Sequence, residues 1–245
     1  MAFVVDFDFT VIASVKYIAA KYSLIVFGNK DGLVPDTELE RIRPLFVESA
    51  RKLVRPHFSE FMRVASEQAT PVYIYTASMD SWANFIVPIV EEIVGYRFAR
   101  PLFTRKDCMT GSWTKSLATI RSRIGDLQDD CITIIDDNAS AWPADSARLI
   151  VCPKYEHLEF EDAFVGVHPT ILNHPSVKSL IQLDKNALFP PVSNLVSRYA
   201  FCVAEIRRIN RASAKQQPDS FWADMKRCLG RVKDPADAVR KCRRR

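Results

Sequence analysis

Two aspartates and a threonine follow the first apolar run of the chain, in the order Asp6-x-Asp8-x-Thr10. In an extended segment residues i and i+2 point the same way, and a bend after the strand would let one carboxylate face a phosphorus atom while the other reaches a leaving oxygen. Two acids in one site can divide the work of nucleophile and general acid–base. The alternative is an aspartate-rich turn whose side chains accept backbone hydrogen bonds. These three residues alone do not decide between the two.

Polar groups after a second apolar run offer contacts to an anion. Thr76 and Ser78 directly follow the apolar residues of "VYIYTAS". A hydroxyl at this point, together with backbone N–H groups such as that of Ala77, can bind a phosphoryl oxygen. A threonine after a strand is also often a helix cap, so this signal is weak when taken singly.

Lys115 lies in "GSWTKSLATI", at or near the start of a helix. A cation is mildly unfavourable at the positive end of a helix, so a lysine at this position indicates that the side chain binds an anion. A lysine that faces solvent is the alternative for this residue alone.

Two adjacent acids, Asp136 and Asp137, follow the apolar run "ITII". Crowded carboxylates at the end of a strand are costly unless a cation neutralises them. Their oxygens are hard ligands, which favour Mg²⁺, an ion that keeps several waters and bridges phosphate. The chain thus carries, in order, a pair of acids, a hydroxyl, a lysine and a second pair of acids, and three of these four groups follow apolar runs that we expect to be buried. This combination is a far more specific sign of phosphate chemistry than any one of its members.

The elements that must position these residues are short strands separated by helices. Each of four apolar runs is β-branched or aromatic and lacks polar alternation, as expected for parallel strands that are covered on both faces. Amphipathic helical patterns separate the runs, which predicts an α/β fold with a doubly wound, mostly parallel sheet. Such a sheet presents its functional residues at the carboxyl ends of its strands. The predicted strands are Phe3–Phe7, Val72–Tyr75, Ile132–Ile135 and Arg148–Val151.

Helical patterns also suggest how the chain is divided. Residues 11–54 form a long, largely helical stretch that we interpret as an insertion after the first strand, covering the active-site end of the sheet. Beyond about Thr170 only helical patterns occur. We therefore expect a core over residues 1–170 and a helical, basic extension over residues 171–245. Within the core we also expect Asp80 to cap the helix of "SWANFIVPIVEEIV" and Gly95 to end it.

Composition sets limits on the class of protein. Of the 245 residues, 48% are hydrophobic and 26% charged, which suits a globular chain with a buried core. The net charge of +5 is concentrated after Arg207, where a basic segment could meet an acidic or nucleic-acid partner or simply be a solvated helix face. The six cysteines form no zinc-ligand pattern and are expected to be reduced, which suggests a cytoplasmic or nuclear protein. No signal peptide or membrane segment is expected.

The order of the four motifs resembles that of the haloacid dehalogenase superfamily. Finer details resemble its branch of RNA polymerase II C-terminal-domain phosphatases, the NLI-interacting-factor-like proteins. The resemblance covers roughly residues 1–155. The stretches that carry it are "RPHFSEFM" (Arg55–Met62), "VYIYTAS" (Val72–Ser78), "RPLFTRKDC" (Arg100–Cys108) with "TK" shortly after, and "IDDNASAW" (Ile135–Trp142).

The resemblance implies a role for each motif residue. Asp6 would be the nucleophile that forms an aspartyl-phosphate, and Asp8 would protonate the leaving oxygen and then activate water. Thr10, Thr76, Ala77 and Lys115 would hold the phosphoryl group. Mg²⁺ would be held by the carboxylates of Asp6 and Asp136 and the backbone carbonyl of Asp8, with Asp137 in support. Phe7 and Phe9 depart from the family pattern, which commonly has leucine or valine at the first position and a small or acidic residue at the second.

These features predict a Mg²⁺-dependent phosphoric monoester hydrolase that acts on phosphoserine or phosphothreonine in proteins or peptides. One alternative is the same chemistry on a nucleic-acid end, favoured by the basic tail, or on a small metabolite, favoured by the long insertion. Another is a non-catalytic binding protein that keeps the fold, against which the complete set of acids argues.

Overall fold

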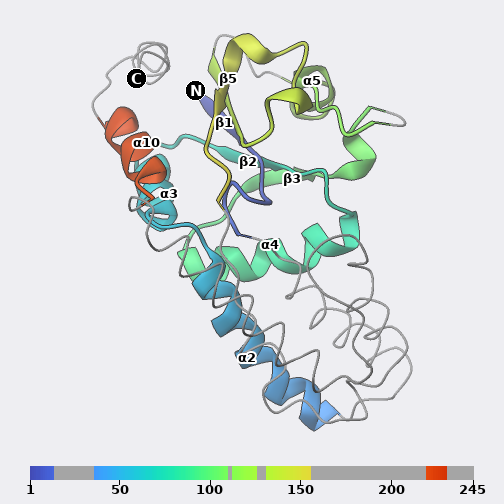
Figure 1. The fold of residues 1–245 in the computed structure, drawn as a ribbon, viewed down its shortest axis with the longest axis vertical. Coiled ribbons are helices and arrows are strands. Elements are labelled where there is room, and N and C mark those ends of the chain that lie inside the picture. The colour runs from blue at the N-terminus through green and yellow to red at the C-terminus, as the bar shows by residue number, and fades with distance from the viewer. Residues whose placement is uncertain (14–35, 110–111, 126–130, 156–218, 231–245) are drawn as a thin grey trace, which may run out of the picture. The chain divides into compact units, whose positions relative to one another are not determined.

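A computed structural model describes residues 1–13, 36–109, 112–125, 131–155 and 219–230 (Figure 1). The chain divides into two compact units. The first contains residues 1–13, 54–155 and 219–245, and the second contains residues 14–53 and 156–218. The expected division at residue 170 and the insertion over residues 11–54 remain predictions, because residues 14–35 and 156–218 lie outside the described ranges.

A five-stranded sheet forms the centre of the first unit. Its strands are β1 (Ala2–Val5), β2 (Val72–Tyr75), β3 (Ala99–Phe103), β4 (Ile132–Asp136) and β5 (Leu149–Val151). They lie in the order β3-β2-β1-β4-β5, and every neighbouring pair is parallel. The predicted α/β class and parallel sheet are confirmed. Four of the strands were expected from their apolar runs, whereas β3 was not.

Helices cover both faces of this sheet because β1 is apolar on both sides. Phe3 meets the ring of Phe61 from α3 (Phe58–Glu67), with 5.2 Å between the ring centroids. Val4, one residue later, points to the opposite face, where it belongs to a core cluster with Leu117 of α5 (Leu117–Ile124). The unit also contains α4 (Asp80–Val94) and α10 (Phe221–Gly230), and α10 lies beside α3 (Figure 1).

The helix boundaries agree with most sequence expectations. Gly95 ends α4 in a left-handed conformation with φ 78°, as predicted. Asp80 is not its cap, however: Met79 occupies that position, and the Asp80 carboxylate instead accepts hydrogen bonds from Thr104 and Lys106. Among the described residues of the first unit there are also short 3₁₀ helices at Arg105–Asp107, Ala139–Ala141 and Ser146–Arg148. In the second unit, α2 (Asp36–Leu53) follows the helical pattern predicted there.

The described ranges contain both free and disulfide-bonded cysteines. Cys108, Cys131 and Cys152 are free thiols, as expected. Cys228 of α10 is disulfide-bonded, so the expectation that all cysteines are reduced is wrong for that residue. Among the helices of the described ranges, none combines the length and apolar composition needed to cross a bilayer.

Candidate active site

The parallel register brings the ends of three strands to one edge of the sheet. Val5 of β1 pairs with Ile74 of β2 on one side and with Ile135 of β4 on the other. The pairing continues one residue further, because the Asp6 backbone N–H donates to the Ile135 carbonyl at 2.8 Å. Residues that follow these strands therefore meet at one edge, as the sequence predicted.

Lys115 joins two of the predicted acids. Its Nζ donates to Asp6 Oδ1 and, at 2.8 Å, to Asp136 Oδ2. Lys115 precedes Ser116, the N-cap of α5, and its backbone N–H donates to the Ala141 carbonyl at 2.7 Å. All three charged side chains are buried, which is tolerable for ions only when they are paired and hydrogen-bonded. The position of Lys115 before a helix thus serves these acids rather than solvent.

Asp136 is held by two further donors. The indole Nε1–H of Trp142 donates to Oδ2 at 2.7 Å, and the backbone N–H of Asn138 donates to Oδ1 at 2.8 Å. The carboxylate is only 1% exposed. These contacts leave Asp136 little rotational freedom, so it is a preorganised ligand or charge partner.

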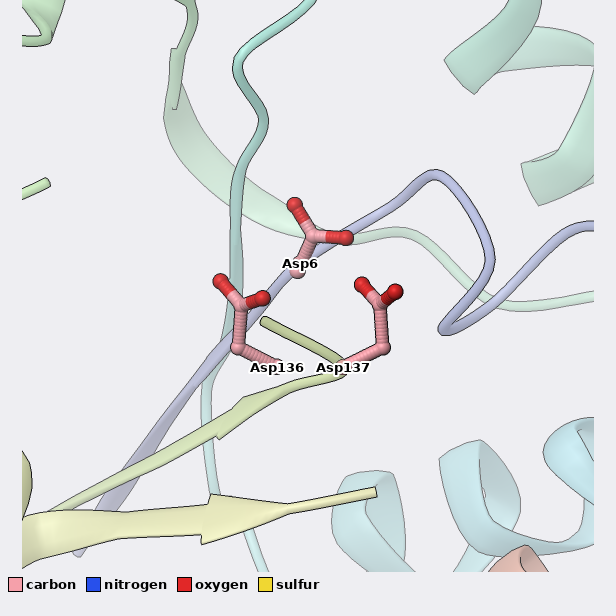
Figure 2. A group of neighbouring side chains, drawn as sticks. All are labelled: Asp6, Asp136 and Asp137. Atoms are coloured by element: carbon pink, nitrogen blue, oxygen red, sulfur yellow. The ribbon is translucent and has the colours of Figure 1, made fainter. Parts of the chain in front are cut away.

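Three carboxylates converge at this point. Figure 2 shows Asp6 from the segment after β1 next to Asp136 and Asp137 from the end of β4. One oxygen from each lies within 4.8 Å of the others, and this is the group of potential metal ligands found among the described residues. Three hard oxygen donors at this spacing suit a divalent cation that prefers oxygen, such as Mg²⁺.

The shifted pKa values of the site residues also favour a bound cation. Burial, and then the charges of Asp136 and Asp8, raise the pKa of Asp6 well above its usual range, although Lys115 opposes this. Burial and the neighbouring Asp136 also raise the pKa of Asp137. Burial alone would lower the pKa of Lys115, but the charges of Asp6 and Asp136 raise it, so the lysine stays charged. One ammonium faces three crowded acids, and a second positive charge would relieve their repulsion.

Asp8 points to a different part of the site. Its Oδ2 accepts hydrogen bonds from Thr76 Oγ1 and Ser78 Oγ, both at 2.8 Å. Its other oxygen, Oδ1, is buried and has no hydrogen-bond partner among the described residues. A buried carboxylate oxygen without a donor is costly, so Oδ1 is the atom of this side chain available to exchange a proton or to contact a ligand.

The remaining predicted residues lie close by but face other partners. The hydroxyl of Thr10 is 3.5 Å from Cys152 Sγ, and Thr10 is fully buried. The carbonyl of Ala77 accepts a hydrogen bond from Arg105 Nε at 2.9 Å. The phosphate-binding roles of Thr10, Thr76, Ala77 and Lys115 remain predictions.

Ser78 and Trp142 contact the acids directly. The sequence suggested Ser78 only as a contact to an anion, not as a partner of Asp8, and it suggested no role for Trp142. Ser78 stands two residues after Thr76, a spacing that would have placed both hydroxyls on one side of an extended segment. Trp142 lies inside the telling stretch "IDDNASAW", yet its indole reaches Asp136 only because the chain turns through the 3₁₀ helix Ala139–Ala141. The periodicity of the local sequence does not predict that the chain turns back toward Asp136.

Comparisons with known proteins concern the family and the fold of the chain. The sequence model of the NLI interacting factor-like phosphatases matches residues 2–175. Among solved structures, the chain is similar to that of Fcp1, described as an essential RNA polymerase II CTD phosphatase, with a TM-score of 0.51 and 14% identity over 98% of this chain. It is also similar to an arginine-to-alanine variant of fission yeast Fcp1 bound to beryllium fluoride, with a TM-score of 0.51 and 16% identity over 94% of this chain. The chain spans 63% and 61% of the lengths of these two.

Proposed function

The chain belongs to the family of NLI interacting factor-like phosphatases, and we propose that it hydrolyses phosphoserine and phosphothreonine in proteins through an aspartyl-phosphate on Asp6, with Mg²⁺ as cofactor. The family and the fold establish the coarser statement, a phosphatase of the haloacid dehalogenase type. The observation that carries the finer one is the buried contact of Lys115 with Asp6 and Asp136, beside the third carboxylate of Asp137.

The first half of the reaction uses Asp6 and Asp8. A carboxylate oxygen of Asp6 attacks phosphorus and forms a new P–O bond, while the P–O bond to the seryl or threonyl oxygen breaks. Asp8, protonated at the start, gives its proton to that leaving oxygen. Thr76 and Ser78 hold Asp8 Oδ2, which leaves Oδ1 to carry the proton.

The second half returns the enzyme to its starting state. Asp8 takes a proton from water, whose oxygen attacks phosphorus and displaces the Asp6 carboxylate. Inorganic phosphate leaves with Asp8 protonated again. Lys115 stays charged throughout, so it can neutralise one oxygen of the phosphoryl group.

The donor set fits Mg²⁺. The carboxylates of Asp6, Asp136 and Asp137 would hold it, together with the backbone carbonyl of Asp8. When bound, the cation would supply charge stabilisation for the transferred phosphoryl group.

The substrate class rests on the family and on the structural likeness to Fcp1, described as an RNA polymerase II CTD phosphatase. A nucleic-acid end or a small metabolite would undergo the same chemistry. The basic residues after Arg207, which lie mostly outside the described residues, favour the nucleic-acid alternative.

An assay of three substrate classes tests this proposal. Wild-type protein and Asp6→Asn are compared on an aryl phosphate, a phosphoserine/phosphothreonine peptide panel and a 3′-phosphorylated oligonucleotide. The amide keeps the packing but is a far poorer nucleophile, so we expect Asp6→Asn to retain less than about a tenth of wild-type kcat, a loss above roughly 1.4 kcal/mol. Asp224→Asn, an exposed acid in α10, is the matched control. Residual turnover above that tenth would overturn the role of Asp6, and preference for the oligonucleotide would overturn the protein substrate.

A further inference from the structure

The carbonyl of Thr10 is the acceptor for two donors from distant parts of the chain. Trp222 Nε1 donates to it at 3.2 Å, and Arg55 Nη1 donates to it at 3.4 Å. Thr10 and Trp222 are completely buried, and Arg55 is 2% exposed. A buried indole N–H or guanidinium needs an acceptor. These two donors therefore define where the backbone lies two residues after Asp8.

Arg55 is itself oriented by the start of α10. Its Nε donates to Asp219 Oδ2 at 2.7 Å, and its guanidinium lies 4.9 Å from the ring centroid of Phe221. Asp219 Oδ1 in turn accepts the backbone N–H of Phe221 at 3.2 Å. The arginine is thus fixed by charge and by stacking, so its Nη1–H arrives at the Thr10 carbonyl in one orientation.

The turn held in this way has an unfavourable backbone conformation. Phe9 has φ 62°, a left-handed value that costs a residue with a side chain about 1 kcal/mol. Such conformations persist only where the surroundings impose them. The carbonyl of Phe9 accepts the backbone N–H of Tyr155 at 2.8 Å, and the carbonyl of Val11 accepts that of Arg55 at 2.9 Å. Successive carbonyls after Asp8 are therefore all held from outside the turn.

Packing of α10 makes this support rigid. The ring of Trp222 meets Phe58 and Phe61 of α3 at centroid distances of 4.8 and 4.7 Å. A separate contact at the other end of the helix does not belong to this support: Gln68 Nε2 donates to the carbonyl of Leu229, seven residues after Trp222, at 3.1 Å. The match to the family ends at residue 175, so α10 lies outside it.

We infer that Arg55, Asp219 and Trp222, here called the Thr10 clamp, are positioning residues for the reaction. They hold the turn after Asp8 so that its carboxylate meets Thr76 and Ser78 at the edge where Asp6 faces the phosphoryl group. This inference rests on the proposed function. A small displacement of a reacting group is enough to slow catalysis strongly, so removal of one clamp donor should lower kcat rather than weaken substrate binding.

Trp222→Phe in the 245-residue chain tests the clamp. Phenylalanine keeps an aromatic ring against Phe58 and Phe61 but lacks the N–H that reaches Thr10. We expect kcat for an aryl phosphate to fall about tenfold, with KM changed by less than about twofold. Gln68→Ala, which removes an α10 contact far from the turn, is the matched control and should leave both constants unchanged. Equal kcat in Trp222→Phe and wild type would overturn the inference.

A second pair of variants separates positioning from folding. Asp219→Asn keeps the shape and the acceptor for Phe221 but weakens the hold on Arg55, whereas Asp219→Glu restores the charge. We expect the first to lower kcat and the second to recover part of it, while a purely structural role would move only their melting temperatures.

Amide hydrogen exchange gives a readout that needs no turnover. The N–H groups of Val11 and Ile12, which donate to the Phe7 carbonyl, should exchange faster in Trp222→Phe but not in Gln68→Ala. If the wild-type protein hydrolysed no ester, the proposed function would fail, and unchanged exchange would separately show that the clamp does not hold the turn.

Discussion

The site depends on a single buried lysine among three acids. Lys115 Nζ contacts Asp6 and Asp136 and lies 5.8 and 5.9 Å from the ring centroids of Tyr75 and Trp142. These two rings are neighbours, with 5.4 Å between their centroids, and they exclude water from one side of the ammonium, which strengthens its charge interactions. The lysine can therefore serve both as the ion-pair partner of Asp6 and Asp136 and as a fixed charge for the phosphoryl group.

We predict that Lys115→Met lowers kcat by about a hundredfold or more, because a charge aimed at the transferred group is lost. Binding of Mg²⁺ should not weaken, since removal of the ammonium leaves the acids more negative. Turnover of an aryl phosphate and calorimetric titration with Mg²⁺ measure the two effects. Lys106→Met, which changes an exposed lysine paired with Asp80, is the control. A variant with normal kcat, or one that no longer binds Mg²⁺, would contradict this role.

Individual residues differ in how well the sequence predicts them. The convergence of Asp6, Asp136 and Lys115 was predictable because each of the two acids ends a buried strand and the lysine begins a helix. Other residues make hydrogen bonds that depend on the tertiary fold. Trp142 reaches Asp136 through a turn of the chain, and Arg55 and Trp222 reach Thr10 from positions distant in the sequence. Their aromatic or basic character in the sequence is compatible with ordinary packing, so no local pattern distinguishes them.

At the scale of elements, α3 ends in a conformation that its sequence does not favour. The Thr70 N–H donates to the Ala65 carbonyl and the Ala69 N–H to the Ser66 carbonyl, the paired bonds of a Schellman motif. The residue at the left-handed position is usually glycine, but here it is Ala69, with φ 49°. Alanine bears the steric cost of that conformation and glycine does not.

Ala69→Gly should therefore stabilise the first unit by about 0.5–1 kcal/mol, against the usual direction for an alanine-to-glycine change. Ala118→Gly, at an exposed right-handed position in α5, should destabilise it by about the same amount. Urea unfolding followed by tryptophan fluorescence measures both. A loss of stability in each variant would show that Ala69 is not strained.

The strands were predictable to the extent that they are buried. β1, β2 and β4 are buried along their whole length and consist mainly of apolar residues, so their composition marked them. β3 lies at an edge of the sheet and contains Arg100 and Pro101, residues that an edge tolerates and a central strand does not. Its ladder with β2, rather than its own apolar content, makes it a strand.

At the scale of the whole molecule, the first unit is assembled from three separate segments of chain. Helix α10 packs against α3, although residues 156–218, which separate α10 from the rest of the first unit in the sequence, belong to the second unit. The helical patterns beyond Thr170 predicted a helix there, but periodicity does not say which partner an apolar face will meet. Because all four tryptophans, at positions 82, 113, 142 and 222, belong to the first unit, intrinsic fluorescence follows the unfolding of that unit.

The acids at the site oppose the stability of this unit. Burial and neighbouring charge raise the pKa of Asp6 and Asp137. Between about pH 4, where these groups titrate in the unfolded chain, and their raised values, the folded protein binds more protons than the unfolded chain. The free energy of unfolding contributed by these groups therefore falls as pH rises through that window. Mg²⁺ binds the ionised acids of the folded state and should offset that loss.

We predict that the increase in melting temperature caused by Mg²⁺, measured against EDTA, is near zero at about pH 4 and grows with pH. At neutral pH, Mg²⁺ at a hundred times its Kd contributes about 2.7 kcal/mol, an increase of about 5–10 °C for a unit of this size. Asp137→Asn should flatten the pH dependence, whereas Asp224→Asn, an exposed acid of the same unit, should leave it intact. The larger Ca²⁺, which prefers more ligands, should stabilise the fold but inhibit turnover because it displaces the nucleophile. An increase that is equal at acidic and neutral pH would mean that the cation binds elsewhere than at Asp6, Asp136 and Asp137.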